Sequence, residues 1–460
     1  MWQSGVLFVG GLAALVYYIF NFAKIGLTEF HAESRASRTV SIFSMSSSTD
    51  LDASDPLARF REEFVHSINE PGLIYLDGNS LGRLPKRSAL AAADLINGQW
   101  GNRLIRGWNE GWFEIPNRVG DLIGELLGAH VGEVVLADNT SVCLFKAAVA
   151  ALKAQPGRTQ ILTDDMNFPS DIQILRSAAE CMGSEHTVEI IRTDGTCGSL
   201  ESVRDHLGDQ TALISLSQVA YKSGWLWDLS EVCKLAKNCG ALSLWDLSHS
   251  VGAVPIDLAA ADVDLAVGCS YKYLNGGPGA PAFIYVSQKT NLFSNPIAGW
   301  YGTENPFQFD FDAQPAAGAG GFITGTPPIL SSALVASGVQ ITLEAGIDRI
   351  RAKSVALTQR FIELVNEHLV SYGFQVASPL DATNRGSHVS LFHPEAQAVG
   401  QALIHEESVI PDFRPPDLLR FGFTRLYTRY ADVDETIERL QRVCETGAIK
   451  RWRDVNPLIP

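Results

Sequence analysis

One lysine in this sequence occupies a place where a charged side chain is unfavourable. Lys272 lies in the segment "SYKYLNGGPGAP", directly after the apolar run "DLAVGC" and before a turn rich in glycine and proline. An ammonium group at the mouth of a buried strand is costly to remove from water. A neutral amine in the same place can attack an aldehyde and form an imine. The segment therefore fits either a solvated loop lysine or an amine that does covalent chemistry.

Other polar side chains follow apolar runs in the same part of the chain. Asp246 ends the run "ALSLWD", and His249 comes three residues later. In an open sheet of parallel strands, ligands bind at the carboxyl ends of the strands, so we expect these side chains to share one crevice. The runs "EVVLAD", "ILTDDMN" and "ALISLS" end at or just before hydroxyl, aromatic and acidic residues: Thr140, Ser141, Phe168, Asp171 and Ser217.

Together these groups match one ligand, pyridoxal 5'-phosphate (PLP). Hydroxyls and free N–H groups at the start of a helix bind a phosphate, and an aromatic side chain covers a flat ring. A buried carboxylate keeps a pyridinium nitrogen protonated, which makes the ring an electron sink. Taken singly, each residue fits a commoner role, such as a loop lysine, a helix cap or a buried histidine. Their order at successive strand ends favours PLP, and the GxGxxG, GxxxxGK[ST] and HExxH motifs of other sites are absent.

The elements that must position these residues can be read from the pattern of the sequence. From about residue 130, short apolar runs alternate with amphipathic stretches, which predicts an α/β domain with a mostly parallel sheet. After residue 330 a long stretch of helical period precedes the strand-like "HVSLFH" and "LRFGFTRLY". We therefore expect four parts: a hydrophobic extension with its linker (1–44), an arm on the small domain (45–75), a large PLP-binding domain (76–330) and a small α+β domain (331–460).

The composition excludes several classes of protein. The chain has 460 residues and a net charge of −15, which argues against a nucleic-acid-binding surface. Its seven cysteines are scattered and form no CxxC pair, so zinc ribbons and thioredoxin chemistry are disfavoured. An odd number of cysteines in a large chain fits a reducing compartment.

The N-terminus carries an uncharged apolar segment. Residues 5–23, "GVLFVGGLAALVYYIFNFA", are long enough to span a bilayer. The basic residues Lys24, Arg35 and Arg38 all follow this segment, so an anchor here would keep the main body in the cytoplasm. The alternative is that the segment is absent from the mature protein, because Met45 begins the ordinary soluble start "MSSSTDLDASDPLARF".

Several longer motifs resemble those of the kynureninase family, which belongs to the aminotransferase class V group of PLP enzymes. The resemblance extends from about residue 50 to 455. The motifs are "YLDGNSLG", "QWGNRLIRGWN", "TSVCLFK", "NFPSDI", "WDLSHSVG", "SYKYLNGGPG", "GWYG", "GTPPIL" and "LRFGFTRLY". It implies an aminotransferase-like fold, a cytoplasmic homodimer, and hydrolysis of L-kynurenine to anthranilate and L-alanine in tryptophan catabolism and NAD biosynthesis. It also implies slower hydrolysis of 3-hydroxykynurenine to 3-hydroxyanthranilate.

The same resemblance implies a role for each site residue. Lys272 binds the cofactor aldehyde and then moves protons, Asp246 pairs with the pyridine nitrogen, and Tyr271 is an acid–base partner. Residues implied to contact the cofactor elsewhere are Thr140, Ser141, Tyr271 and Trp300 at the phosphate, Phe168 and His249 at the ring, Asp171 and Ser217 near its hydroxyl, and Thr326. Residues implied to contact the substrate are Arg420 at the α-carboxylate and Ser80, Trp108, Gly325 and Thr326 at the aryl end.

Two positions in this set bear on the choice of substrate. Trp108 and Thr326 match the bacterial-type pattern of the family, which prefers L-kynurenine, whereas the vertebrate-type pattern has His and Asn there. The resemblance also makes Trp108, Trp300 and Thr326 candidates for donation by the second subunit of a dimer. The sequence departs from the family at Cys143, where Asn is common, and in its hydrophobic extension.

Two other functions stay open from the sequence. A cysteine desulfurase-like lyase of the same group needs a mobile catalytic cysteine in a loop, and the sequence offers no obvious one. A catalytically inactive, membrane-anchored homologue is the other alternative. The intact set of Lys272, Asp246 and Arg420 argues against it.

Overall fold

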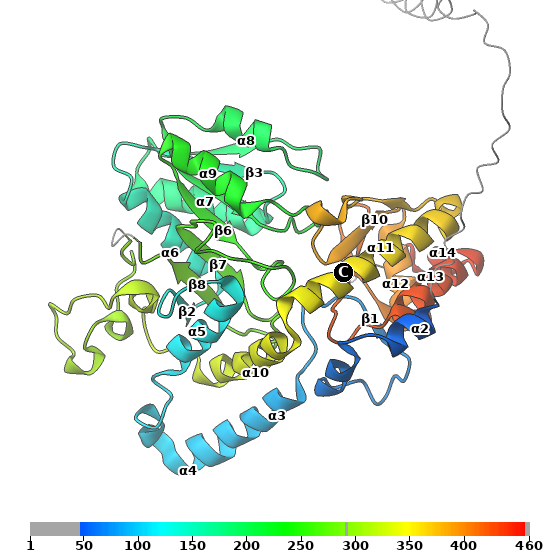
Figure 1. The fold of residues 1–460 in the computed structure, drawn as a ribbon, viewed down its shortest axis with the longest axis horizontal. Helices are drawn as coiled ribbons and strands as arrows, with labels where there is room; N and C mark the ends of the chain where they lie inside the picture. Colours follow the sequence, from blue (N-terminus) through cyan, green and yellow to red (C-terminus); the bar gives the residue numbers. More distant parts are fainter. Residues whose placement is uncertain (1–46, 290–292, 456–460) are drawn as a thin grey trace, which may run out of the picture. The chain divides into compact units, whose positions relative to one another are not determined.

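A computed structural model describes residues 47–289 and 293–455 of the chain, all within one unit that begins at Ser47 (Figure 1). The apolar segment predicted at residues 5–23, and the 1–44 extension that contains it, lie outside the described residues. Within the described residues, no single helix is long and apolar enough to cross a membrane. Only the bent pair formed by α10 (Ile329–Ala345) and α11 (Ile347–His368) passes that test together.

The larger sheet has seven strands in the order β2-β8-β7-β6-β5-β3-β4. Neighbouring strands from β7 through β4 run parallel, whereas β8 is antiparallel to both β7 and β2. The predicted mostly parallel, mixed sheet is therefore confirmed. The strands are β2 (Val134–Ala137), β3 (Gln160–Asp164), β4 (Thr187–Ile191), β5 (Thr211–Ser217), β6 (Leu242–Asp246), β7 (Leu265–Cys269) and β8 (Ala282–Val286).

Helices cover both faces of this sheet, which explains why its central strands are apolar almost throughout. Along β8, Ile284 packs into one core cluster, whereas Phe283 and Tyr285 pack into the other. One cluster includes α6 (Thr140–Lys153) and α7 (Pro169–Met182). The other includes α5 (Ile115–Leu127), α8 (Leu200–His206), α9 (Leu229–Cys239) and α10 (Ile329–Ala345).

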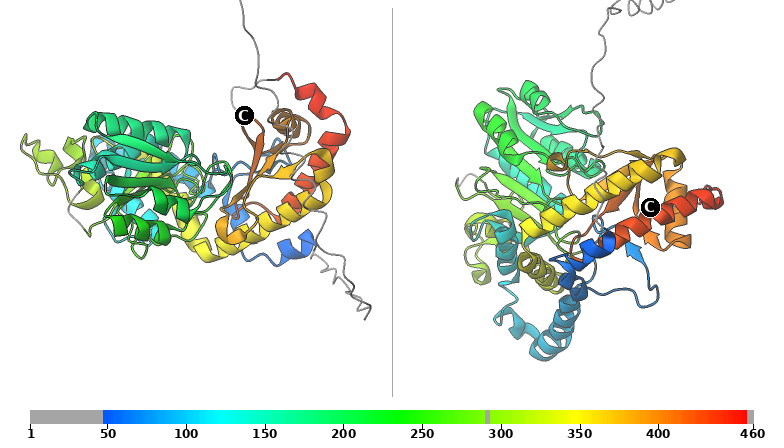
Figure 2. Two further views of the ribbon diagram at one scale, coloured as in Figure 1. Left: turned by 90° about the horizontal axis from the view of Figure 1, so that it is seen from above. Right: turned by 45° about the vertical axis from the view of Figure 1, so that its right-hand side comes forward.

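A second sheet is antiparallel and has four strands in the order β12-β13-β10-β9. Helix α11 (Ile347–His368) follows α10 and packs beside this sheet (Figure 1, Figure 2). The strands are β9 (Gln375–Val376), β10 (His388–Phe392), β12 (Asp412–Arg414) and β13 (Leu418–Gly422). The other helices around it are α12 (Ala396–Glu406), α13 (Tyr430–Glu445) and α14 (Ala448–Trp452).

The N-terminal segment packs against these C-terminal elements. Helix α2 (Ser48–Ala53) lies beside α13, where the Asp52 carboxylate accepts hydrogen bonds from the backbone N–H groups of Tyr430 and Ala431. Strand β1 (Ile74–Tyr75) pairs in parallel with β11 (Val409–Ile410). The domain boundaries expected at residues 75 and 330 stay predictions. The remaining α-helices are α3 (Lys86–Ala93) and α4 (Gly101–Arg103).

Helix α10 lies directly against the loop that carries Lys272. Gly338 faces the backbone of this loop so closely that a Cβ atom on it would overlap the carbonyl oxygen of Leu274. The loop therefore packs directly on the helix because residue 338 has no side chain. Gly124 in α5 provides a comparison, because a Cβ atom there would meet its nearest neighbour, a methyl group of Val134, at 3.6 Å.

We predict that Gly338→Ala lowers the free energy of unfolding by about 1–3 kcal/mol, because the added methyl group must push the Leu274 backbone away. Gly124→Ala is the matched control, and its effect is expected to lie between neutral and about 1 kcal/mol of stabilisation, since alanine favours a helix. Urea unfolding of both variants measures the difference. Equal effects at the two positions would contradict the close packing described here.

Candidate active site

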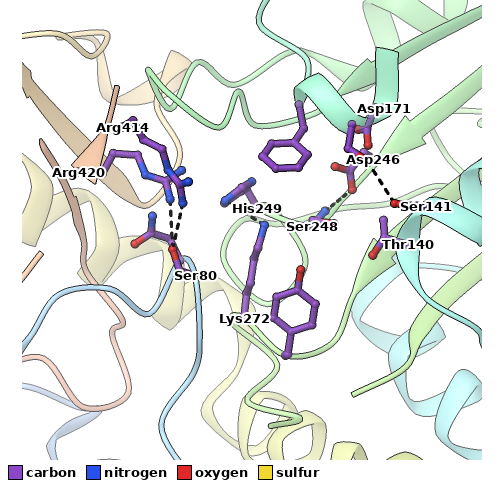
Figure 3. Close-up of a pocket in the computed structure, with 14 residues that line it drawn as sticks. Ser80, Thr140, Ser141, Asp171, Asp246, Ser248, His249, Lys272, Arg414 and Arg420 are labelled. Atoms are coloured by element: carbon purple, nitrogen blue, oxygen red, sulfur yellow. Dashed lines mark hydrogen bonds between the residues drawn. The ribbon is translucent and has the colours of Figure 1, made fainter. Parts of the chain in front are cut away.

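A cavity of about 220 Å³ lies where several strands of the large sheet end, and two arginines of the small sheet close its other side (Figure 3). It brings together these predicted residues: Ser80, Thr140, Ser141, Phe168, Asp171, Asp246, His249, Tyr271, Lys272 and Arg420. Its other lining residues are Asn79, Ser170, Ser248 and Arg414. Strand ends that are far apart in the sequence thus meet at one place, as expected for an open α/β sheet.

Lys272 projects into the middle of the cavity, beside a buried imidazole. Its Nζ atom lies 3.1 Å from Nε2 of His249. Burial, followed by the positive charge of Lys272, holds the pKa of His249 well below its ordinary value. The ring is therefore neutral at neutral pH and can accept a hydrogen bond from the lysine amine.

Tyr271 precedes this lysine and lines the same cavity. Interaction with the neighbouring Cys269, followed by burial, raises the pKa of Tyr271 above its ordinary value. The phenol therefore keeps its proton across the physiological range and is available as a hydrogen-bond donor or a proton donor.

Two carboxyl groups lie together on the side of the cavity away from the arginines (Figure 3). Asp246 ends β6, and its Oδ1 atom accepts a hydrogen bond of 2.8 Å from the backbone N–H of Ser248. Asp171 stands in the first turn of α7 and is almost completely buried. Burial and the charge on Asp246 raise the pKa of Asp171 well above its ordinary value. Within the described residues, Oδ2 of Asp171 is buried without a hydrogen-bond partner, so this oxygen is left to pair with a donor or a cation of a ligand.

Hydroxyl groups from two helix starts lie next to these carboxyls. Asn139 caps α6 by accepting a 3.0 Å hydrogen bond from Val142 N–H, which sets Thr140 and Ser141 in the first turn. The Ser141 Oγ atom lies 3.3 Å from Oγ of Ser170, in the first turn of α7. Two helix N-termini with free N–H groups and three hydroxyls favour a phosphate here.

The opposite side of the cavity is strongly basic. Arg420 on β13 has a side chain only 1% exposed, and its Nε atom donates to Asp412 Oδ2 at 2.6 Å. Arg414 at the end of β12 lies 2.9 Å from the same oxygen through Nη2. Ser80 lies between them and accepts a hydrogen bond of 3.2 Å from Arg420 Nη2.

The lining residues that the sequence did not single out fall into two kinds. Asn79, Ser170 and Ser248 belong to the quoted motifs "YLDGNSLG", "NFPSDI" and "WDLSHSVG", so motif membership was a signal for them. Arg414 had no such signal. It enters the cavity because β12 pairs with β13 in a register that sets Asp412 opposite Arg420.

Five predicted residues do not line the cavity of this chain: Ser217, Trp108, Trp300, Gly325 and Thr326. Ser217 is buried behind it, where its hydroxyl donates to Asn167 Oδ1. The ring of Trp108 packs edge-on against Trp112 and Tyr301, with centroid distances of 5.9 and 6.5 Å. Trp300 also packs on Tyr301, and Thr326 is exposed.

The lining residues fit PLP when they are tested group by group. The unpartnered oxygen of Asp171 and the adjacent Asp246 match a protonated pyridine nitrogen, which supplies both a donor and a positive charge. The hydroxyls at the helix starts match the phosphate, and the Lys272 amine matches the aldehyde. Phe168, at the start of α7, offers a flat face to the ring.

Solved structures with the same fold define the class of protein. The cysteine desulfurase CsdA from Escherichia coli matches with a TM-score of 0.71 and 16% identity, covering 85% of this chain and 98% of that one. C-DES with glycine covalently linked to its PLP cofactor matches with a TM-score of 0.70 and 17% identity, covering 83% and 98%. At these identities the likeness concerns the fold alone, which is that of the class V PLP enzymes.

Sequence relatives then define the family. The kynureninase of Pseudomonas fluorescens is 41% identical over 408 residues, which are 87% of this chain and 95% of the relative. A kynureninase of Burkholderia pseudomallei is also 41% identical, over 88% of this chain and 95% of the relative. Residues 350–440 match the family model of the kynureninase C-terminal domain. The chain belongs to the kynureninase family.

This membership confirms the fold, the family, the activity and the cofactor predicted from the sequence. The protein is a hydrolase of the kynurenine pathway that depends on PLP and acts on a small-molecule substrate.

Asp77 adds a titratable group next to the two arginines. Its Oδ1 atom is buried and has no hydrogen-bond partner in the part of the chain that the structure describes. Burial, followed by the charge on Asp412, raises the pKa of Asp77 to about 7, and Ser80, Arg420 and Arg414 only partly offset this increase. The folded protein therefore holds a proton on Asp77 at pH values where the unfolded chain has lost it.

We predict that Asp77 makes stability depend on pH between about 4 and 7. Because its folded pKa is raised, its contribution is fully present below the unfolded pKa near 4 and is lost as the pH rises through about 7. From pH 5 to pH 8 the wild type should lose roughly 2 kcal/mol of unfolding free energy relative to Asp77→Asn. Urea unfolding at several pH values tests this, with Asp312→Asn in an exposed loop as control. Parallel curves for wild type and Asp77→Asn would contradict it.

Proposed function

We propose that the cavity around Lys272 is the active site, and that it hydrolyses L-kynurenine to anthranilate and L-alanine. One observation carries the proposal: an amine, a pair of buried carboxyls and a buried arginine converge on one cavity. These are the groups needed to bind an aldehyde, a pyridine ring and an amino-acid carboxylate. The distribution of charge supports the same orientation, with carboxyls at one side and arginines at the other (Figure 3).

The cofactor end of the cavity is assigned to residues of the large sheet. Bound PLP supplies an aldehyde carbon and a protonated ring that accepts electrons from the substrate. Lys272 binds the aldehyde, and Asp246 keeps the proton on the ring nitrogen. Thr140, Ser141 and the N-terminus of α6 hold the phosphate. His249 keeps Lys272 in place through the contact of 3.1 Å, without adding a charge of its own.

The substrate end is assigned to residues that lie on the other side of Lys272. Arg420 binds the substrate α-carboxylate. With PLP and substrate bound, Lys272 would take the proton from the substrate Cα atom. Water would then add to the side-chain carbonyl. As the Cβ–Cγ bond breaks, its electron pair would stay on Cβ and take up a proton there, so that anthranilate leaves and alanine remains. Tyr271, which keeps its proton, is the acid–base partner for this step.

We predict that the purified protein forms anthranilate from L-kynurenine, with a higher kcat/KM than for 3-hydroxykynurenine, because Trp108 and Thr326 follow the pattern of the kynurenine-specific members. Lys272→Ala should lower kcat by at least about 10²–10⁴-fold. Lys289→Ala, at an exposed lysine paired with Asp262, is the control and should keep full turnover. Anthranilate fluorescence measures all three proteins. Full turnover of Lys272→Ala, or sulfide release from L-cysteine without anthranilate formation, would refute the assignment.

The homodimer expected for the family is proposed for this chain on two grounds. Trp108, Trp300 and Thr326 do not line the cavity of their own chain. The structure also exposes large apolar side chains on two segments, residues 90–105 and 297–311: Leu90, Trp100, Leu104, Ile105, Ile297, Phe307, Phe309 and Phe311. The two groups adjoin, since Phe113 contacts both Tyr301 and Phe307. An apolar surface of this kind marks an interaction site, and a second copy that covers it brings these residues to the neighbouring cavity.

We predict that a mixture of two inactive variants regains activity in a dimer with shared sites. Lys272→Ala and Trp108→Ala, when co-expressed, form mixed dimers in which one site has both native residues. Random pairing gives about a quarter of wild-type turnover. Co-expression of Lys272→Ala with Asp246→Ala is the control. Each site takes Lys272 and Asp246 from the same chain, so a mixed dimer of these two variants has no site with both residues and should stay inactive. Recovery in the control and none with Trp108→Ala would contradict donation by the partner.

The N-terminal anchor stays a prediction made from the sequence alone. Residues 5–23 lie outside the described residues. The basic residues after this segment place the catalytic part in the cytoplasm if the segment spans a membrane.

A further inference from the structure

Two arginines in the cavity share a single carboxylate oxygen. Oδ2 of Asp412 accepts from Nε of Arg420 at 2.6 Å and also from its Nη2. The same oxygen accepts from Nε of Arg414 at 3.1 Å and lies 2.9 Å from its Nη2. Ser80 Oγ is 3.4 Å away. One oxygen thus accepts hydrogen bonds from two guanidinium groups. Arg414 and Arg420 therefore have more N–H donors than this carboxylate can accept from.

Arg420 is already largely occupied by the protein. Of its five N–H groups, two point to Asp412, one to Ser80, and one to the carbonyl oxygen of Tyr221 at 2.5 Å. A carboxylate that binds an arginine in the favoured bidentate way needs two parallel N–H groups. Within the described residues, one N–H group of Arg420 is left without an acceptor. A second donor must therefore come from another side chain.

Arg414 is placed to supply that donor. It lines the same cavity, and its side chain is 26% exposed, in contrast to the 1% of Arg420. Its recorded hydrogen bonds use Nε and Nη2, so its Nη1 group has no protein acceptor in the described structure. Figure 3 shows both guanidinium groups side by side, facing the cavity above Ser80.

The net charge of the cluster formed by Arg414, Arg420, Asp412 and Asp77 also favours the binding of one more anion. Arg414 and Arg420 carry two positive charges, against the single carboxylate of Asp412. Asp77 is the other acid nearby, and its pKa of about 7 means that it is only partly ionised at neutral pH. A ligand with one carboxylate would balance the cluster.

The turn at residues 221–222, which follows β5, contacts the chain at both arginine positions. The Tyr221 carbonyl oxygen holds Arg420, and the Lys222 amine donates to the carbonyl oxygen of Pro415, the residue after Arg414, at 3.3 Å. Asp412 and Arg420 lie directly opposite each other in the β12–β13 ladder. The Tyr221 carbonyl oxygen therefore holds the guanidinium group of Arg420, and the Lys222 contact holds the backbone next to Arg414.

We infer that Arg414 is a second arginine for the substrate carboxylate and that Asp412 is a positioning residue that holds Arg414 and Arg420 as a pair. The inference rests on the proposed function and deepens it, since it adds a binding residue to the role of Arg420. The substrate carboxylate then takes one N–H group from each arginine, while Asp412 keeps the Nε edges of both.

The test compares two ligands on the PLP-loaded, full-length enzyme. L-Kynurenine carries the carboxylate, and its decarboxylated analogue keeps the amine and the aryl ketone but has no carboxylate. Arg414→Gln should raise the KM for L-kynurenine by about 10–100-fold, as expected for the loss of a charge-assisted hydrogen bond, with a much smaller change in kcat. Inhibition by the analogue should stay within about twofold of wild type, because it does not reach the arginines.

Further variants keep the result interpretable. Arg414→Lys retains the charge but not the planar fork, so its KM should fall between wild type and Arg414→Gln. Asp412→Asn should raise the KM for L-kynurenine and leave inhibition by the analogue unchanged. Arg451→Gln, which removes an exposed ion pair with Glu406, is the control and should change neither constant.

The outcomes separate this inference from the proposed function. If wild type does not turn over L-kynurenine, the proposed function fails. If wild type is active and both Arg414 variants keep the wild-type KM, the inference is overturned. It is also overturned if they weaken kynurenine and the analogue equally, because that result indicates a structural role. Should Arg414→Gln not fold, Arg414→Lys alone decides between these outcomes.

Discussion

Two carboxyl groups, Asp171 and Asp246, share a buried position at one side of the cavity, and like charges so close together cannot both ionise without a compensating cation. The structure shows this constraint in the raised pKa of Asp171 and in its unpartnered oxygen. A protonated pyridine ring meets both demands. The rest of the cavity is arranged around this fact, with Lys272 in the middle beside an uncharged His249 and two arginines on the far side.

The separation of carboxyls and arginines on opposite sides of the cavity depends on two different sheets. The large sheet presents its polar residues at strand ends, where the chain leaves an apolar layer. The small sheet contributes the arginines through the pairing of β12 with β13. The loop around Lys272 is held between them: Leu274 packs on Gly338 of α10, and the guanidinium group of Arg425 lies 4.8 Å from the ring centroid of Tyr273. A substitution at Gly338 or at Arg425 is therefore expected to shift the loop that carries the Lys272 amine.

Much of the site could be predicted because its residues lie at the end of an apolar run or within a few residues after it. Lys272, Asp246, His249, Thr140 and Asp171 obey that rule, and the topology of a parallel sheet then brings them together. Arg420 could be assigned only through the resemblance to the family, because a lone arginine in a strand suggests an ion pair. The structure shows such a pair as well, with Asp412.

The remaining part of the site depended on information that local patterns do not contain. Arg414 reaches the cavity through the register of two strands, and register is set by pairing and turn geometry rather than by the residue itself. Trp108 and Trp300 match the family motifs but lie in an apolar region outside the cavity of their own chain. A motif assigns residues to a site without saying which subunit supplies them.

The central claim is that the Lys272 amine carries the cofactor, and chemical trapping tests it most directly. Reduction of the PLP-saturated protein with borohydride converts the link between amine and aldehyde into a stable bond. Mass spectrometry of the digested protein should then find the phosphopyridoxyl group on the peptide that contains Lys272 and on no other. A label on Lys146, Lys222 or another lysine in place of Lys272, or no label at all, would contradict the account.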